Sequence, residues 1–267
     1  MNFTTISNAM KVTGLSYLGS INSNAKMVKN KKVSNNYTYF LNLSPANTSG
    51  YNVCPYSTKE CRLGCLATSG RAKVEIWTGK NVIRNARIKK TKLFFEQNEF
   101  FMRWLIADIK AKQRKAKKDG YNFSVRLNGT SDIEWENHKI DGLNIFEHFP
   151  EVQFYDYTKN YNRMYSTSAI KNYQLTYSYN GNNENKCIDL LQNKKNVAIV
   201  FNIKDAKELP AEWNGFEVIN GDLTDYRPSD GHGVVVGLKW KDMPDKSINE
   251  RVKNSKFVLQ VVEPTAV

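Results

Sequence analysis

Three cysteines in one short loop are the residues of this sequence whose type and spacing are best suited to chemistry. Cys54, Cys61 and Cys65 form a C-x6-C-x3-C pattern within the turn-rich run NVCPYSTKECRLGCLATSGR. Pro55 and Gly64 interrupt regular structure in this run, so packing in a helix or strand core does not explain the thiols. Because cysteine thiolates that lie close together bind soft metals, the sequence predicts a metal centre held by these three residues.

An iron–sulfur cluster of the 4Fe-4S or 3Fe-4S type is the predicted occupant, since three cysteines would hold it and leave one position open for another ligand. Zinc stays an alternative, although structural zinc usually takes four ligands from two C-x2-4-C pairs. Cys187, the fourth cysteine, is a candidate fourth ligand or a buried apolar residue. A disulfide between two of the three loop cysteines would leave one thiol over.

The overall charge favours polyanionic partners. The chain has 267 residues with 39 Lys and Arg against 26 Asp and Glu, a formal net charge of +13. A nucleotide or nucleic acid is the first partner that this surplus suggests, and a merely solvated lysine-rich surface is the alternative. The sequence shows neither a charged-then-apolar leader nor an apolar run of membrane-spanning length, so we expect no membrane association and an intracellular location.

The first part of the chain divides into an arm and the start of a domain. Residues 1–36 are rich in Asn, Ser and Lys and are predicted to form an N-terminal arm, with a single domain over residues 37–267. Residues 37–43 are apolar and aromatic, which predicts a strand directly before the cysteine loop. Residues 80–118 have helical periodicity, with a break near Lys92 and an end at Gly120.

After this helical region, short apolar strands alternate with stretches of helical length. This rhythm predicts an α/β fold with parallel strands, specifically a small (β/α)8 TIM-like barrel in which some helices are trimmed to turns. A doubly wound open sheet is the alternative. The predicted later strands are 123–127, 152–155, 173–177, 197–201, 216–219, 234–238 and 257–262, and the predicted helices are 141–148, 161–171, 184–194 and 204–209.

Polar residues follow most of these strands, and in a barrel they would meet at one face around the cysteine loop. We interpret Asp156 and Lys159 as an acid–base couple and Asp132 as a third catalytic candidate, with helix capping as the alternative for both carboxylates. The acidic run GDLTDYRPSDGHG has the donors to hold a ribose or a phosphate, although Asp and Gly also simply form turns. The cofactor-binding candidates are Asn128, Ser178, Asp222, Asp225, Arg227 and Lys239.

Several spaced motifs resemble one known family. LNLSPA followed by the cysteine loop, and then NGTSDI, FYDYTK, LTYSY, NGDLTDYR and VVVGL, are similar to the phage Gene product 88 family. The resemblance covers roughly residues 37–238. It implies a bacteriophage origin and a setting in the host cytoplasm, and the family brings no settled activity with it.

A more distant likeness concerns architecture alone. Radical-SAM enzymes also carry three cluster cysteines in the loop after the first barrel strand, and they use polar residues at later strand ends to hold their cofactor. Their usual motif is C-x3-C-x2-C, whereas this chain has C-x6-C-x3-C. S-adenosylmethionine therefore stays an open alternative that rests on analogy of fold.

Taken together, the residues predict an iron–sulfur barrel enzyme that performs redox or radical chemistry on a nucleotide or nucleic acid. The alternative is a binding module for nucleic acid or a host factor, in which zinc or a cluster is structural. A histidine zinc site and a Ser–His–Asp hydrolase lack support, because His138, His148 and His232 are scattered and no G-x-S-x-G motif is present.

Overall fold

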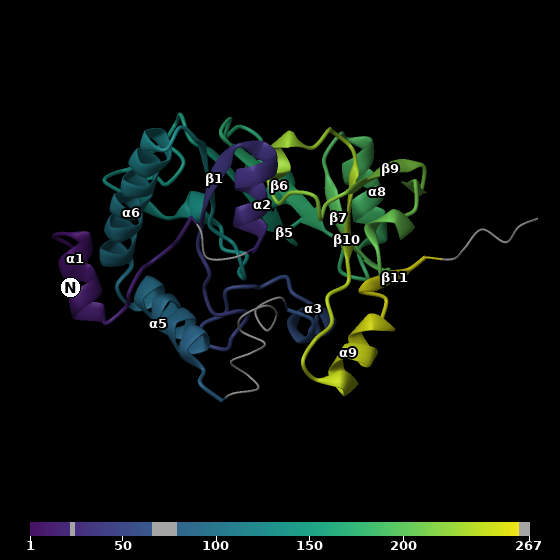
Figure 1. Ribbon diagram of the computed structural model, residues 1–267, viewed down its shortest axis with the longest axis horizontal. Helices are drawn as coiled ribbons and strands as arrows, with labels where there is room; N and C mark the ends of the chain where they lie inside the picture. The colour runs from purple at the N-terminus through teal and green to yellow at the C-terminus, as the bar shows by residue number, and fades with distance from the viewer. Residues whose placement is uncertain (22–24, 66–78, 262–267) are drawn as a thin grey trace, which may run out of the picture.

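The computed structural model describes residues 1–21, 25–65 and 79–261, and a mostly parallel sheet forms its centre (Figure 1). Nine strands of the described residues make this sheet, in the order β1-β2-β5-β6-β7-β10-β9-β8, with β11 also paired to β7. All pairs are parallel except β8 with β9. The strands are β1 (Asn36–Phe40), β2 (Asn122–Arg126), β5 (Gln153–Thr158), β6 (Tyr173–Ser178), β7 (Val197–Asn202), β8 (Glu212–Trp213), β9 (Phe216–Asn220), β10 (Val235–Lys239) and β11 (Val258–Gln260).

Helices of very different length connect these strands. A separate two-stranded ribbon of β3 (Lys139–Ile140) and β4 (Leu143–Asn144) follows the short helix η2 (Trp135–Asn137). The other 3-10 helices among the described residues are η3 (Ala206–Glu208) and η4 (Arg227–Ser229). The α-helices are α1 (Ile6–Thr13), α2 (Ala25–Ser34), α3 (Lys59–Leu63), α5 (Val82–Glu96), α6 (Asn98–Lys118), α7 (Arg163–Ser166), α8 (Glu184–Gln192) and α9 (Lys246–Lys253).

The predicted (β/α)8 barrel is wrong, because the strand order does not run around a closed ring. β10 lies between β7 and β9, and β11 pairs with β7, so the last strands return to the middle of the sheet. β1 and β8 end the strand order. The hairpin of β8 and β9 is part of the departure: Asn214 and Gly215 both have positive φ, as a tight two-residue turn requires, and the antiparallel β8 ends the strand order beside β9.

The individual elements follow the sequence more closely than the topology does. All eight predicted strands are present, with ends shifted by a few residues, and the predicted helix 184–194 corresponds to α8. The long helical region breaks at Gln97 instead of near Lys92. The predicted helix 141–148 is wrong, since Asp141 and Gly142 take positive φ and form the turn of the β3–β4 ribbon.

The core lies between the sheet and α6, the longest helix of the described residues. Trp104, Leu105 and Ile109 of α6 are fully buried, at the spacing that places one helix face against the strands. Residues before β1 also enter the core, because Ala9 and Leu18 are fully buried and Ser20 forms a bridge with Phe40. Among the described residues, no helix is both long and apolar enough to cross a membrane.

Candidate functional site

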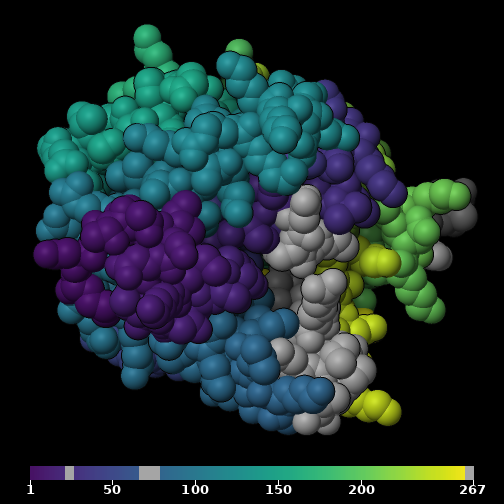
Figure 2. Space-filling model, turned by 60° about the vertical axis from the view of Figure 1, so that its left-hand side comes forward, coloured from purple at the N-terminus to yellow at the C-terminus, as the bar shows by residue number. Residues whose placement is uncertain are grey.

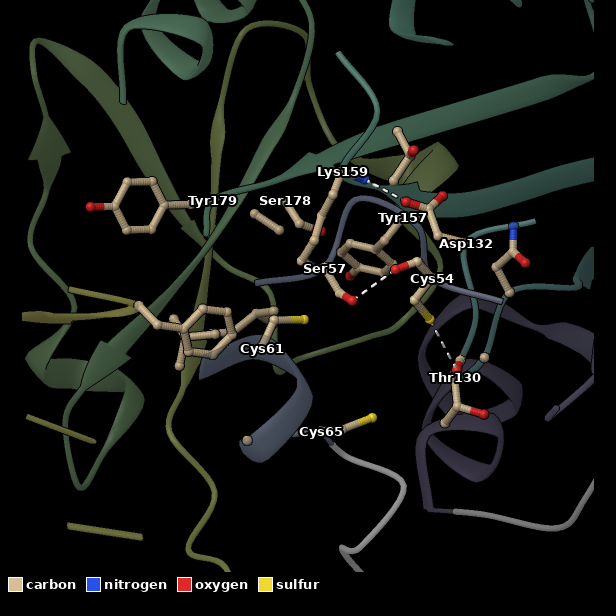
Figure 3. Close-up of a pocket in the computed structure, with 18 of the residues that line it drawn as sticks. Cys54, Ser57, Cys61, Cys65, Thr130, Asp132, Tyr157, Lys159, Ser178 and Tyr179 are labelled. Atoms are coloured by element: carbon tan, nitrogen blue, oxygen red, sulfur yellow. Dashed lines mark hydrogen bonds between the residues drawn. The ribbon is translucent and has the colours of Figure 1, made fainter. Parts of the chain in front are cut away.

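A cavity of about 220 Å³ lies where the parallel strands end, between the sheet and the cysteine loop (Figure 3). All three loop cysteines line it. The polar residues that line it lie at or just after the ends of five different strands, β2, β5, β6, β9 and β10, although the sheet is open instead of closed. Those of the predicted site residues that line it are Cys54, Cys61, Cys65, Asn128, Asp132, Lys159, Ser178, Asp222 and Lys239.

Local hydrogen bonds fix the position of the cysteine loop. Thr58 is the N-cap of α3, and its hydroxyl accepts a hydrogen bond from the backbone N–H of Cys61 at 3.2 Å. Cys61 therefore lies within α3 and Cys65 follows its end. On the other side of the cavity, the Cys54 thiol donates to the carbonyl oxygen of Thr130 at 3.8 Å, and the Ser57 hydroxyl donates to the Cys54 carbonyl at 2.7 Å.

The three sulfurs surround a common space, as Figure 3 shows. None of them forms a disulfide bond. In the positions that the described side chains occupy, no three His, Cys, Asp or Glu residues are grouped closely enough to hold a metal ion. The loop continues into residues 66–78, which lie outside the described residues.

Lys159 reaches into the space between the thiols. Burial lowers the pKa of its ammonium, but the neighbouring Cys61 and Asp132 outweigh burial, so the pKa is raised overall. Burial also raises the pKa of Cys54 to about 12, although Lys159 acts in the opposite direction. The Cys54 thiol is therefore protonated at neutral pH unless a cation or a metal ion stabilises its thiolate.

Asp132 is held by groups from two neighbouring segments. One carboxylate oxygen accepts from the backbone N–H of Lys159 at 2.8 Å, and the other lies 3.3 Å from Nη1 of Arg163. Arg163 is itself fully buried and makes a two-pronged contact with Glu136, at 2.6 and 2.7 Å. Asp132 thus joins the loop after β2 to the loop after β5 and fixes the wall of the cavity beside Lys159.

Asn128, a predicted cofactor ligand, organises the loop that follows β2. Its side-chain oxygen accepts from the N–H groups of Ile133 and Trp135 and from the Ser131 hydroxyl, at 3.0, 3.1 and 2.8 Å. Its amide nitrogen donates to the Ile133 carbonyl at 2.9 Å. Asn128 lines the cavity, but both polar atoms of its side chain form hydrogen bonds within the loop. Trp135, one of its partners, packs in the hydrophobic core.

We expect Asn128→Leu to lower the free energy of unfolding by about 3 kcal/mol, because it leaves buried groups of Ile133 and Trp135 without partners. Urea titrations that follow tryptophan fluorescence measure this change. Ser178→Ala is the matched control, since Ser178 also lines the cavity but its side chain has no hydrogen bond to another described residue. Equal loss in the two variants would contradict the role of Asn128.

Asp156, a predicted catalytic residue, lies beneath the cavity and outside its lining. It is 1 % exposed, and its carboxylate accepts from the backbone N–H of Asn128 at 2.7 Å and from the Tyr173 hydroxyl at 3.3 Å. Burial raises the pKa of Asp156 to about 7, although Arg126 and the Asn128 N–H act in the opposite direction.

We expect Asp156→Asn to stabilise the protein above neutral pH. Between the unfolded pKa of about 4 and the folded pKa of about 7, the folded state binds the extra proton, so the wild type loses stability as pH rises through this range. The variant should exceed the wild type by about 4 kcal/mol at pH 8, since one pKa unit corresponds to about 1.4 kcal/mol, and the difference should disappear near pH 4. Denaturant titrations at both pH values test this, and a difference independent of pH would contradict it.

The residues of the acidic run after β9 lie in two different places: one lines the cavity and two are buried elsewhere. Asp222 lines the cavity, where its carboxylate accepts from the backbone N–H of Lys239 at 2.8 Å. Asp225 and Arg227 are buried away from the cavity lining: Asp225 pairs with Arg126 at 2.5 Å, and Arg227 lies 3.3 Å from Asp230 and donates to the Thr224 carbonyl.

Four further cavity residues, which are not among the predicted site residues, belong to the strands themselves or to the loop after β10. Arg126, at the end of β2, lies between the rings of Phe40 and Tyr157, 4.9 and 4.6 Å from their centroids. Arg126 and Tyr157 line the cavity, as do Trp240 and Lys241 after β10. The strand alternation carried a signal for Arg126, because a charged residue at an inward-facing strand position needs a partner.

Cys187, considered above as a fourth ligand, is fully buried in α8 and is not part of the cavity lining. Burial raises the pKa of its thiol to about 12. It packs in the hydrophobic core, which fits its interpretation as an apolar residue.

The fold and the site together define an open, mostly parallel α/β protein with a cysteine-bearing loop over the carboxyl ends of its strands. The model of the family Gene product 88 matches residues 17–258, and the chain therefore belongs to this family. This confirms the phage family indicated by the spaced motifs. No curated protein and no solved structure matches the chain significantly.

Proposed function

We propose that this protein is an iron–sulfur-dependent enzyme of a bacteriophage, with a cluster of the 4Fe-4S or 3Fe-4S type held by Cys54, Cys61 and Cys65. The observation that supports this proposal best is that all three thiols line one cavity together with polar groups from five strand ends. A cluster in this place would supply one-electron chemistry to a molecule bound in the same cavity.

The charges around the cavity suit a centre of thiolates. Three deprotonated cysteines carry negative charge, which is costly to bury without compensation. Lys159 is in contact with Cys61 and close to Cys54, and Arg126, Lys239 and Lys241 line the same cavity. Lys159 is the cation that directly offsets the thiolate charge, since Arg126 is paired with Asp225 and Lys241 lies near Asp222, and the lysines of the lining also favour an anionic substrate.

The cavity lining also indicates the class of substrate. Aromatic side chains of Tyr157, Tyr179 and Trp240 lie among the cations. Aromatic rings stack on nucleobases and cations contact phosphate groups, so this mixture suits a nucleotide or a nucleotide unit of a nucleic acid. Lys159 and Asp132 are the residues placed to orient the substrate beside the thiols.

Iron and sulfide analysis after anaerobic reconstitution tests the proposal. The full chain is purified without oxygen, incubated with ferrous iron, sulfide and a thiol reductant, and desalted. Stoichiometric iron and sulfide with broad visible absorption are the expected result. A folded, colourless protein that retains no iron in this experiment would overturn it, and stable zinc in its place would indicate a different metal centre.

A structural metal site is the second candidate, favoured by the way the loop is bound to the sheet. The backbone N–H of Asp132 donates to the Val53 carbonyl at 2.7 Å, directly before Cys54. A zinc ion or cluster there would brace the loop of a nucleic-acid or host-factor binding module. In that case metal removal lowers thermal stability and leaves binding intact. For both candidates the host cytoplasm is the proposed setting, based on the phage family.

A further inference from the structure

The basic helix α2 contacts the rim of the cavity through Lys29. Lys29 donates from Nζ to the backbone carbonyl of Asp222 at 2.7 Å, and the Asp222 carboxylate lies 3.7 Å from Nζ of Lys241. Asp222 and Lys241 both line the cavity. Lys29 and Lys32 are exposed and three residues apart, so they project from neighbouring positions on one side of the helix.

The last turn of α2 lies near the basic end of α6. Nζ of Lys31 lies 4.8 Å from the ring centroid of Tyr121 and 5.2 Å from that of Tyr37. The Tyr37 hydroxyl donates to Asp119, which also pairs with Lys115 at 2.8 Å. Figure 2 shows α2 in dark violet beside the teal residues at the end of α6.

Lys117 and Lys118 extend this charge further along the surface. Both are exposed at the last turn of α6, and α2 contains no acidic residue. Two segments that are about 80 positions apart in the sequence thus form one cationic surface, which we name the α2 track. Its members are Lys29, Lys31, Lys32, Lys115, Lys117 and Lys118.

We propose that the α2 track binds the phosphate backbone of a nucleic-acid strand and leads it to the cavity. α2 has 10 residues and is therefore about 15 Å long, and together with the last turn of α6 it offers a surface that several phosphates of one strand can contact. The track ends at Asp222 and Lys241, so a strand that follows it reaches the rim beside the cavity.

This inference deepens the proposed function, because it identifies the substrate as a nucleic-acid polymer instead of a free nucleotide. Lysine contacts to phosphate are independent of base sequence, so the track supplies affinity and orientation, and the cavity supplies recognition of the reacting unit. The partly buried Tyr121, stacked on Tyr37 with ring centroids 4.5 Å apart, holds Lys31 in place within the track.

The test compares two quadruple variants of the full chain in binding to a fluorescent single-stranded oligonucleotide of about 12 nucleotides. The track variant carries Lys29→Gln, Lys32→Gln, Lys117→Gln and Lys118→Gln. The matched control replaces four exposed lysines of other elements with glutamine, and so removes the same charge: Lys11, Lys139, Lys171 and Lys207. Fluorescence anisotropy is measured over a series of salt concentrations.

We expect the track variant to bind at least about tenfold more weakly at low salt, with a log–log salt slope smaller by about 3, since each lost phosphate contact on a single strand removes about 0.7. The control should bind within about twofold of the wild type. Equal weakening of both variants, an unchanged slope of the track variant, or absence of binding by the wild type would overturn the inference.

The outcome is separate from that of the iron experiment. The lysines of the track variant do not line the cavity, so this variant should retain as much reconstituted iron as the wild type. If the wild type binds the oligonucleotide along the track but takes up no iron, the proposed enzyme fails and the nucleic-acid surface stands. If it takes up iron but binds no oligonucleotide, the track fails and the iron centre stands.

Discussion

Asp225→Leu is expected to lower the free energy of unfolding by about 3–5 kcal/mol, because it leaves the guanidinium of Arg126 buried without its counter-ion. Arg126 and Asp225 are 7 % and 3 % exposed, and their atoms lie 2.5 Å apart. Among the described residues, Nε of Arg126 already has no hydrogen-bond partner, so the remaining arginine has little to compensate the loss. Thermal and urea unfolding measure the change.

The double variant Arg126→Met, Asp225→Leu separates the cost of an unpaired charge from the value of the pair. We expect it to recover most of the lost stability, since apolar residues of similar size replace a buried ion pair at little cost. Asp141→Asn is the control, because the pair of Asp141 with Arg103 is exposed and should leave the melting temperature nearly unchanged. A double variant as unstable as Asp225→Leu would contradict this account.

The position of the cavity could be predicted from the sequence, whereas buried pairs such as Arg126–Asp225 could not. The strands were evident because each is a short apolar run with a polar residue at its end, and strand ends of parallel sheets meet at one edge. Cys61, Lys159 and Asp222 therefore line one cavity, although the predicted closed barrel is wrong. Residues that follow parallel strands lie at the same edge of the sheet because the strands run in the same direction, whether the sheet is closed or open.

The positions of Asp225 and Arg227, by contrast, could not be predicted from the sequence. They stand in the same acidic run as Asp222, and nothing in the sequence distinguishes a carboxylate at the cavity from one that pairs in the interior. The difference arises from distant residues, since Asp225 finds Arg126 in β2 and its N–H donates to the Asn30 side chain in α2 at 2.7 Å. Such partners depend on tertiary structure, which local patterns do not encode.

The topology was mispredicted for a local reason that the sequence does contain. Asn214-Gly215, flanked by Trp213 and Phe216, is a strong signal for a two-residue hairpin. The predicted strand 216–219 is only the second strand of this hairpin, and no strand is predicted over Glu212–Trp213. Recognising it would have placed an antiparallel strand at the edge of the sheet, which a closed barrel of parallel strands does not accommodate.

Replacement of any loop cysteine is expected to have the largest effect on the proposed metal centre. Loss of a group that only orients a metal ligand costs about 10–100-fold in affinity, so Cys54→Ser, Cys61→Ser and Cys65→Ser should each cost at least as much. After anaerobic reconstitution and desalting, each variant should retain much less iron and sulfide than the wild type, with loss of the visible absorption.

Cys187→Ser is the matched control for this series, because it removes the remaining thiol from α8 without touching the cavity. It should keep the iron content of the wild type, even if its melting temperature falls when a buried polar hydroxyl replaces the thiol. Circular dichroism shows that each variant is folded before iron is compared. If a folded Cys61→Ser variant binds as much iron as the wild type, the thiols around Lys159 do not hold the metal, and the charge balance of the cavity requires another explanation.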